Sequence, residues 1–356
     1  MEELAGALRR AATERPSDFR AALQLLWIVA LVDCAYITPN PTLTVGRMDL
    51  ILYPLYEKDV RTGRLTRDEA RALIIDYYCK HNLIMGRGEH QVGDATNSTT
   101  FQRICNFDAP QYLHLAGTDE NGHPVANELT QLFAECICPK FKNPVIVVRY
   151  FKGLNTTHPE LWDVLMEKAL ASSALMIYND DNTLKTYARM GIPEADARRY
   201  SHFGCNWPSL GTQSAWMLGG PHSSKFCAYK DEEERKSLCI PYMRMNSEYG
   251  WPDDLMTVLR EYAGRDDASI DKIYAGFLAR MGDFVDRKLA LEAHELEVRQ
   301  RRPSAVLTFG DCFFDDSLRK AECFAASAKY HFEPQSFYMC GTVANCMTVI
   351  DELVFS

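Results

Sequence analysis

The chain has 356 residues, of which 47% are apolar and 24% charged, with a formal net charge of −9 at pH 7. These fractions are typical of a globular protein and exclude disordered, collagen-like and membrane-embedded chains. The acidic balance, with no basic run, argues against a nucleic acid partner, because binding to phosphates needs clustered positive charge.

Neither an export signal nor a membrane span is expected. The first residues, Met1-Glu2-Glu3-Leu4, are acidic where a secretory signal would be basic. The longest apolar run, 25–32, has eight residues, against the roughly 20 needed to cross a bilayer. None of the twelve cysteines forms a C-x-x-C pair, which argues against zinc ribbons, thioredoxin-type centres and iron–sulfur cradles. We therefore expect a cytoplasmic protein without a bound metal.

In chain order, the first third reads as helical. Apolar residues recur at three- and four-residue spacing over 19–30, after a helix cap at Ser17. A turn at 62–63 precedes a capping box over 66–69 that begins a second helix. We expect residues 1–105 to form a helical N-terminal region.

The middle of the chain alternates strands and helices. A β-branched and aromatic run over 144–151 predicts a strand buried on both faces. A helix over 157–173, a short strand over 174–178, a helix over 182–190 and a last short helix over 194–200 follow. This alternation is typical of α/β proteins, in which ligand-binding loops follow the strands.

The final third reads as helical again. A helical pattern covers 252–298, Asp315-Asp316 begins a helix to Tyr330, an extended stretch surrounds 335–339, and a terminal helix begins at Gly341. Since no Gly/Ser- or Pro-rich linker interrupts the chain, we expect one compact body over all 356 residues.

One short segment, 201–208, stands out for chemistry. Cys205 lies between Gly204 and an Asn-x-Pro turn, which predicts a loop tip whose backbone can approach a ligand. The alternative is that Cys205 is a small buried apolar residue like most cytosolic cysteines. The common nucleotide, zinc-protease and esterase motifs are absent from the sequence.

Cys205 belongs to an ordered series of segments with a family resemblance. They are Asn143-Pro144 through Arg149, Pro159 through Trp162, Met176 through Asp180, Gly191 through Tyr200, and Gly204-Cys205 with Pro208. In order and spacing this series resembles the core of the glycyl radical enzymes, the pyruvate formate-lyase family. Flanking segments extend the resemblance over nearly the whole chain.

The resemblance implies an α/β barrel of two half-sheets surrounded by helices, formed by residues 106–356, with Cys205 on a finger loop inside it. By position, Cys205 matches the cysteine that becomes a thiyl radical in this family. The radical originates at a glycine on a separate C-terminal loop. A barrel interior would protect such a radical from water.

Two departures from the family pattern shape the expected chemistry. The R-V-x-G-Y-type loop is missing, so we expect no cofactor bound by this chain, with the organic radical supplied in trans by a separate glycine-radical protein and a radical-forming activase. Trp207 stands where many dehydratases carry a general-base Glu, and Asn206 where pyruvate formate-lyase has a second cysteine. The usual diol or amine elimination is therefore not expected.

Five other residues are candidates for substrate binding. Arg149, within an apolar strand, either binds an anionic substrate or pairs with a carboxylate such as Asp180 or Glu135. Two aromatic side chains have open roles: His202 tunes the thiol or faces solvent, and Trp207 walls the site or packs. Asn179 and Asp180 close a turn beside the Cys205 loop or contribute to the site.

Three functions stay open from the sequence. The first is a glycyl-radical-enzyme-like lyase core acting on a small carboxylated or aromatic metabolite, with Cys205 at the thiyl position. The second is an oxygen-tolerant enzyme without radical chemistry, with Cys205 as a thiolate or bystander. The third is a non-catalytic binding or regulatory subunit. We expect a homo-oligomer with a small-molecule substrate.

Overall fold

The structure, a computed structural model, describes residues 6, 9, 13–32, 43–82, 111–141, 143–202, 208–216, 251–300, 309–322, 327–332 and 340–355. It separates into two compact units, Met1–Ser214 and Ala215–Ser356. Each unit buries an apolar cluster of its own. This division differs from the single body that the sequence predicts.

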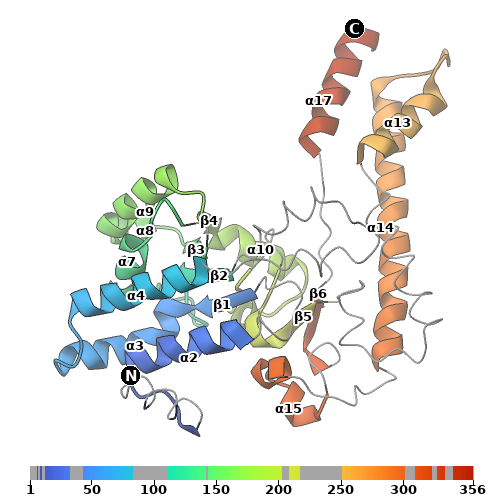
Figure 1. Cartoon of the computed structure of the whole chain (residues 1–356). Coiled ribbons are helices and arrows are strands. Elements are labelled where there is room, and N and C mark those ends of the chain that lie inside the picture. The colour runs from blue at the N-terminus through green and yellow to red at the C-terminus, as the bar shows by residue number, and fades with distance from the viewer. Residues whose placement is uncertain are drawn as a thin grey trace, which may run out of the picture. The chain divides into compact units, whose positions relative to one another are not determined.

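The N-terminal unit contains a four-stranded parallel sheet. Its strands are β1 (Leu43–Arg47), β2 (Gln111–Ala116), β3 (Val145–Tyr150) and β4 (Leu175–Asn179). They lie side by side in the order of the chain, β1-β2-β3-β4 (Figure 1). The predicted strands over 144–151 and 174–178 are thus confirmed, as is the α/β class.

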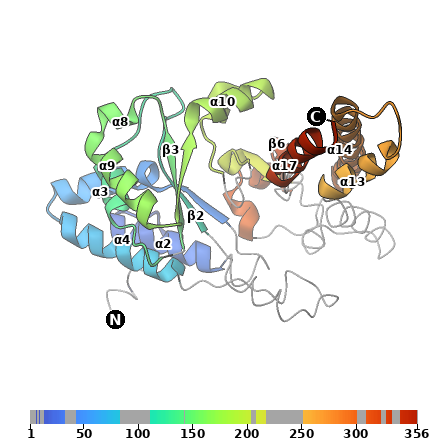
Figure 2. The ribbon, with the colours of Figure 1, turned by 90° about the horizontal axis from the view of Figure 1, so that it is seen from above.

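Helices cover one face of this sheet. They are α2 (Phe19–Val32), α3 (Met48–Arg61), α4 (Arg67–Asn82), α7 (Glu128–Glu135), α8 (Leu154–Thr157) and α9 (Pro159–Ala171). Figure 2 shows α3, α4 and α9 on the same side of β2 and β3. Alternate strand residues such as Leu113, Leu115, Ile146 and Val148 join the helices in one apolar cluster.

The opposite face of the sheet is polar although it is buried. Successive side chains of a strand alternate between faces, so His114 and Arg149 point away from the apolar cluster that holds Leu115 and Val148. Both His114 and Arg149 have no exposed surface. Because burying polar groups costs free energy unless they are paired, this face needs a specific hydrogen-bond arrangement.

Local sequence signals explain how the first helices begin. The Thr66 hydroxyl accepts from the Glu69 amide at 3.2 Å, and the Glu69 carboxylate accepts from the Thr66 amide at 2.8 Å, so the predicted capping box is confirmed. The first helix is capped by Asp18 rather than by Ser17, since the Asp18 carboxylate accepts from the Ala21 amide at 2.8 Å.

Two strands of the four-stranded sheet escaped the sequence analysis. β1 lies within residues 1–105, which the sequence predicts as a helical N-terminal region, and it forms an edge of the sheet. Gly46, with φ +74°, interrupts its apolar pattern. β2 is buried along its whole length. Its polar residues Gln111 and His114 interrupt the apolar pattern from which a buried strand is predicted.

Beyond β4 the N-terminal unit continues with α10 (Asp180–Arg189) and α11 (Glu194–Ala197), followed by the short 3-10 turn Gly211–Gln213. Both helices were predicted.

Ala116 and Gly117 have positive φ values of +58° and +84°, so the chain turns sharply as it leaves β2.

The C-terminal unit is built from α13 (Trp251–Tyr262), α14 (Ile270–Gln300) and α17 (Cys340–Ile350), which a π-helical segment, Asp351–Phe355, extends. Its apolar cluster includes Val258, Phe277 and Val343. The predicted helix over 252–298 is therefore two helices, with a break that contains Gly264 at φ +74°. The predicted terminal helix is confirmed.

The remaining elements of this unit are short. They are the 3-10 segment Phe309–Phe313, α15 (Ser317–Lys320), and the strands β5 (Ser214–Trp216) and β6 (Tyr330–Phe332), which pair with each other. The prediction of a helix to Tyr330 is wrong, because α15 ends at Lys320, Ala321 is left-handed at φ +53°, and Tyr330 lies in a strand. The predicted extended stretch over 335–339 lies outside the described residues.

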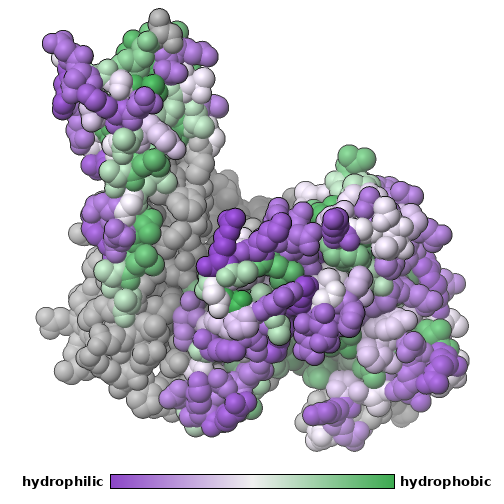
Figure 3. Space-filling view, turned by 180° about the vertical axis from the view of Figure 1, so that it is seen from behind, coloured by the Kyte–Doolittle hydropathy of each residue, from purple (hydrophilic) through white to green (hydrophobic). Residues whose placement is uncertain are grey.

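Hydrophobic residues are exposed along the C-terminal helices in the space-filling view of Figure 3, and the exposed apolar side chains there include Leu278, Leu289 and Leu353. None of the helices in the described ranges combines the length and apolar character that crossing a membrane requires.

Candidate functional site

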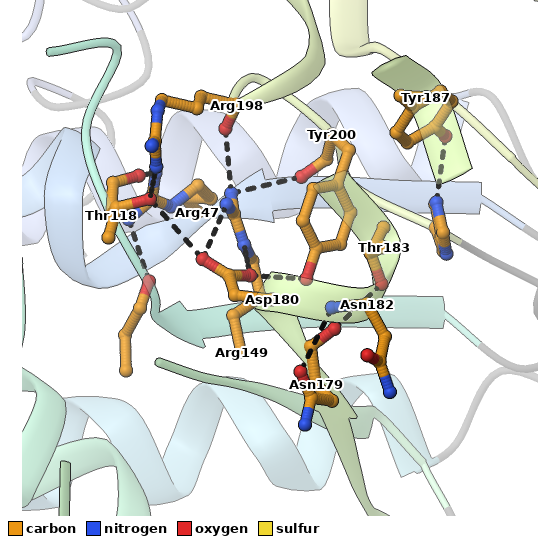
Figure 4. Close-up of polar contacts among 12 residues, drawn as sticks. Arg47, Thr118, Arg149, Asn179, Asp180, Asn182, Thr183, Tyr187, Arg198 and Tyr200 are labelled. Carbon is orange, nitrogen blue, oxygen red and sulfur yellow. Dashed lines mark hydrogen bonds and ion pairs between the residues drawn. The ribbon is translucent and has the colours of Figure 1, made fainter. Parts of the chain in front are cut away.

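A buried group of charged and aromatic side chains occupies the carboxyl end of the parallel sheet, on its polar side (Figure 4). Arg47 ends β1, Arg149 lies near the end of β3, and Asp180 directly follows β4. Their exposed fractions are 7%, 0% and 1%. The carboxyl ends of parallel strands are where α/β proteins usually bind ligands.

Arg149 and Asp180 form a two-pronged ion pair. The Arg149 Nε donates to Asp180 Oδ1 at 2.8 Å, and Nη2 donates to Oδ2 at 3.1 Å. Burial alone lowers the pKa of Arg149, but Tyr200 and Asp180 outweigh that effect and raise its pKa. Arg149 therefore stays charged, and the two charges neutralise each other in the interior.

Tyr200 is the third member of this group. Its ring lies 3.8 Å from the Arg149 guanidinium carbon, and its hydroxyl donates to Asp180 Oδ1. Burial, together with the neighbouring Asp180, raises the pKa of Tyr200 even though the charge of Arg149 opposes the change. Tyr200 is therefore a neutral hydrogen-bond donor at physiological pH.

Arg47 and Asp49 hold the sharp turn that follows β2. Arg47 Nη2 donates to the Ala116 carbonyl at 2.6 Å, and Asp49 Oδ2 accepts from the Ala116 amide at 2.6 Å. The Thr130 hydroxyl also donates to this carboxylate, at 2.7 Å. Burial lowers the pKa of Arg47 to about 10 and raises the pKa of Asp49.

The turn that follows β2 packs against Arg149. A Cβ on Gly117 would lie 2.8 Å from both Cβ and Nε of Arg149, a distance that real Cβ contacts do not reach. The next residue, Thr118, donates to Asp180 Oδ2 at 3.3 Å and accepts from Arg198 at 2.6 Å. The loop after β2 is thus part of the same arrangement.

His202 lies among tyrosines at the edge of this group. Its ring centroid is 4.7 Å from that of Tyr200, 5.6 Å from Tyr178 and 5.8 Å from Tyr187, and its Nε2 is 2.8 Å from the Tyr187 hydroxyl. His202 is 8% exposed, so the alternative that it faces solvent is excluded. Its influence on the Cys205 thiol stays a prediction.

The other predicted site residues have different outcomes. Of the two readings of Arg149, the structure has the ion pair, and its partner is Asp180, while Glu135 binds Arg67 and Arg71 at 2.8 Å each. Asn179 is exposed and caps α10, with its side chain accepting from the Asn182 amide at 3.0 Å. Cys205 and Trp207 lie outside the described residues.

Several members of the group were not singled out from the sequence: Arg47, Asp49, Thr118, Arg198 and Tyr200. The available signal was positional, since each follows or closely neighbours the end of a strand or a short helix. β1 and β2 had not been recognised, so their ends could not be used. In the parts of the chain that the structure describes, no three His, Cys, Asp or Glu side chains gather as a metal site would require.

Comparison with known proteins assigns this arrangement to a family. The model of the family described as pyruvate formate lyase-like matches residues 1–226, well over half of the chain. The chain belongs to the pyruvate formate lyase-like family. The resemblance seen in the sequence is thereby confirmed.

Relatives of this pyruvate formate lyase-like chain are glycyl radical enzymes. The glycyl radical subunit of 4-hydroxyphenylacetate decarboxylase from Clostridioides difficile is 29% identical over 231 residues, which cover 61% of this chain and 24% of the relative. Isethionate sulfite-lyase from Nitratidesulfovibrio vulgaris is 24% identical over 212 residues, covering 59% and 24%. The chain thus matches about a quarter of the length of these curated relatives.

Solved structures show the same fold. Hydroxyproline dehydratase from Clostridioides difficile matches with a TM-score of 0.70 at 18% identity, over 96% of this chain and 40% of that one. Glycerol dehydratase from Clostridium butyricum matches with a TM-score of 0.69 at 18% identity, over 98% and 43%. These neighbours are α/β barrels surrounded by helices, and this chain, with its parallel sheet and covering helices, has the fold of the part that it matches.

Proposed function

We propose that this chain provides the thiyl-cysteine part of a glycyl radical lyase, with Cys205 as the residue that removes a hydrogen atom from a small carboxylated or aromatic metabolite. One observation carries the proposal: in a chain of this family, the backbone that precedes Cys205 is hydrogen-bonded to Arg149 near the carboxyl end of a parallel sheet, and the Ser201 amide joins it to the Ser209 carbonyl beyond Cys205. Ligand sites of α/β proteins lie at that end.

The names of the relatives support a small anionic substrate, and one of them supports the carboxylated, aromatic class. One relative is a decarboxylase of 4-hydroxyphenylacetate, which is both aromatic and carboxylated, and others are lyases of isethionate, a small sulfonate. Anionic substrates are common to both. Arg149 does not supply their counter-charge on its own, because Asp180 already neutralises it. We propose that it acts on the site through the fold instead.

The proposed chemistry balances as a hydrogen-atom exchange. The oxidising equivalent comes from a glycyl radical held by residues outside these 356, after the action of a radical-forming activase. The Cys205 sulfur accepts a hydrogen atom from a substrate carbon, which leaves a carbon radical that can lose a neighbouring group. The resulting product radical takes the hydrogen atom back from the Cys205 thiol.

The test is an anaerobic co-expression with a radical-forming activase and a glycine-radical protein of this family. We expect a glycyl doublet by electron paramagnetic resonance, and turnover of arylacetates or short sulfonates. Cys205→Ser is expected to abolish turnover, whereas the matched control Cys138→Ser keeps it.

Turnover by Cys205→Ser would contradict the proposal. Turnover in air without the activase would favour the thiolate enzyme instead. A stoichiometric hetero-complex in native mass spectrometry, with no turnover in any combination, would favour the binding subunit.

A further inference from the structure

The two ends of the segment around Cys205 are held together at their base. The Ser201 amide donates to the Ser209 carbonyl at 2.9 Å, and both residues are buried, at 4% and 6% exposure. The Leu210 amide donates to the Ser214 hydroxyl at 2.8 Å. The residues on the two sides of 203–207 are therefore joined to each other at Ser201 and Ser209.

Arg149 holds the backbone of residues 198–200, which leads into this base. Its Nη1 donates to the Arg198 carbonyl at 2.9 Å and to the Tyr200 carbonyl at 3.2 Å. Tyr200 is thus held by its backbone, by its ring over the guanidinium, and by its hydroxyl on Asp180. Three contacts therefore hold Tyr200 against Arg149 and Asp180.

Asp180 makes this arrangement possible by orienting the guanidinium. Two parallel hydrogen bonds from Arg149 fix the plane of the fork, so that its remaining Nη1 donors point at the two carbonyls. A lysine would supply the charge without the fork.

The energetics of buried ion pairs indicate that such a pair serves to fix the positions of groups rather than to add stability. Removing two charges from water offsets most of their attraction, so that a fully buried pair contributes little net stability compared with apolar side chains of similar size. Arg149 and Asp180 are 0% and 1% exposed in their side chains. Their retention in the interior calls for a role in specifying position.

We infer that Arg149 and Asp180 are positioning residues that, through Tyr200, fix residues 198–201, from which the segment carrying Cys205 begins. The inference rests on the proposed function for its purpose, since Cys205 lies three residues after His202 and three before Pro208. A hydrogen-abstracting sulfur must be placed closely against its substrate.

The test measures amide hydrogen exchange in Arg149→Met, Arg149→Lys and Asp180→Asn, with Glu135→Gln as matched control. Glu135 forms ion pairs with Arg67 and Arg71 in the same unit, away from this group. We expect exchange in peptides spanning 198–202 and 208–214 to accelerate about tenfold or more in the three variants, while peptides of β3 and the control stay as in the parent.

A double variant separates positioning from stability. Arg149→Met with Asp180→Leu replaces the pair by apolar side chains. We expect its unfolding midpoint to recover toward that of the parent while exchange at the base of the segment stays fast. The inference is overturned if the double variant recovers both the unfolding midpoint and slow exchange at the base of the segment. It is also overturned if exchange accelerates throughout β3 in all single variants. Either result would show that the ion pair is merely structural.

The rate of Cys205 alkylation by iodoacetamide gives a second readout, with exposed Cys79 as internal reference. We expect the ratio of the two rates to change in Arg149→Lys and to stay constant in Glu135→Gln. An unchanged ratio in Arg149→Lys would contradict the inference. Neither readout needs the radical, so failure of the proposed lyase chemistry would leave both results interpretable.

Discussion

At the scale of single residues, Gly117 shows how little space the site leaves. We predict that Gly117→Ala loses about 2–4 kcal/mol of unfolding free energy, of which about 1 comes from the left-handed backbone and the rest from displacing Arg149. Gly63→Ala is the matched control, since Gly63 has φ +68° and nothing within 4 Å of its Cβ position. Urea unfolding measures the unfolding free energy of the two variants. Equal losses in Gly117→Ala and Gly63→Ala would contradict the steric argument.

A second prediction at this scale concerns His81, which is completely buried. Burial lowers its pKa from 6.5 to about 4. Between these values the unfolded chain binds a proton that the folded chain does not, so stability is full above pH 6.5 and falls as the pH drops toward 4. The loss from this group is about 3 kcal/mol.

Urea unfolding at several pH values between 7.5 and 4.5 measures this dependence. His81→Gln is expected to flatten the slope, because it removes the buried imidazole that must take up the proton. Parallel slopes for the parent and His81→Gln would contradict the assignment.

Residue chemistry also decided which parts of the site the sequence could predict. An arginine inside an apolar strand must find a partner, and this argument named Asp180 among two candidates for Arg149. Tyr200 gave no such signal, because the sequence does not distinguish a buried tyrosine from an exposed one. Its role depends on a carboxylate that lies 20 residues earlier in the chain.

At the scale of elements, α10 offers a test of the role of Asn179. Asn179→Ala is expected to lose about 1 kcal/mol of stability, because the amide of Asn182 loses its acceptor. Asn179→Asp keeps the acceptor and adds a charge that suits a helix start, so it should retain stability. If Asn179→Asp keeps stability but loses substrate affinity, Asn179 also contacts substrate.

The predictability of elements followed their patterns. β3 is a run of β-branched residues and was predicted close to its true limits, and the capping box predicted where α4 begins. β2 combines full burial with Gln111 and His114, and Gln111 is paired through its amide and its side chain with a distant residue, Asn143. Such long-range pairing leaves no trace in local periodicity.

At the scale of the whole molecule, two separate apolar clusters predict two folding units. Leu165→Ala in the N-terminal cluster and Leu255→Ala in the C-terminal cluster remove the same atoms from buried positions. Each is expected to cost its own unit about 2–5 kcal/mol. Hydrogen exchange should accelerate in β3 only for the first variant and in α13 only for the second. Acceleration in both units by either variant would indicate one cooperative body.

The strand order of the sheet has a consequence for how the protein is made. Because the spatial order β1-β2-β3-β4 is also the order of synthesis, each strand of this sheet after β1 finds a neighbour already present when it leaves the ribosome. Asp180 follows the last of these strands, so the ion pair with Arg149 closes only when the whole sheet has been assembled.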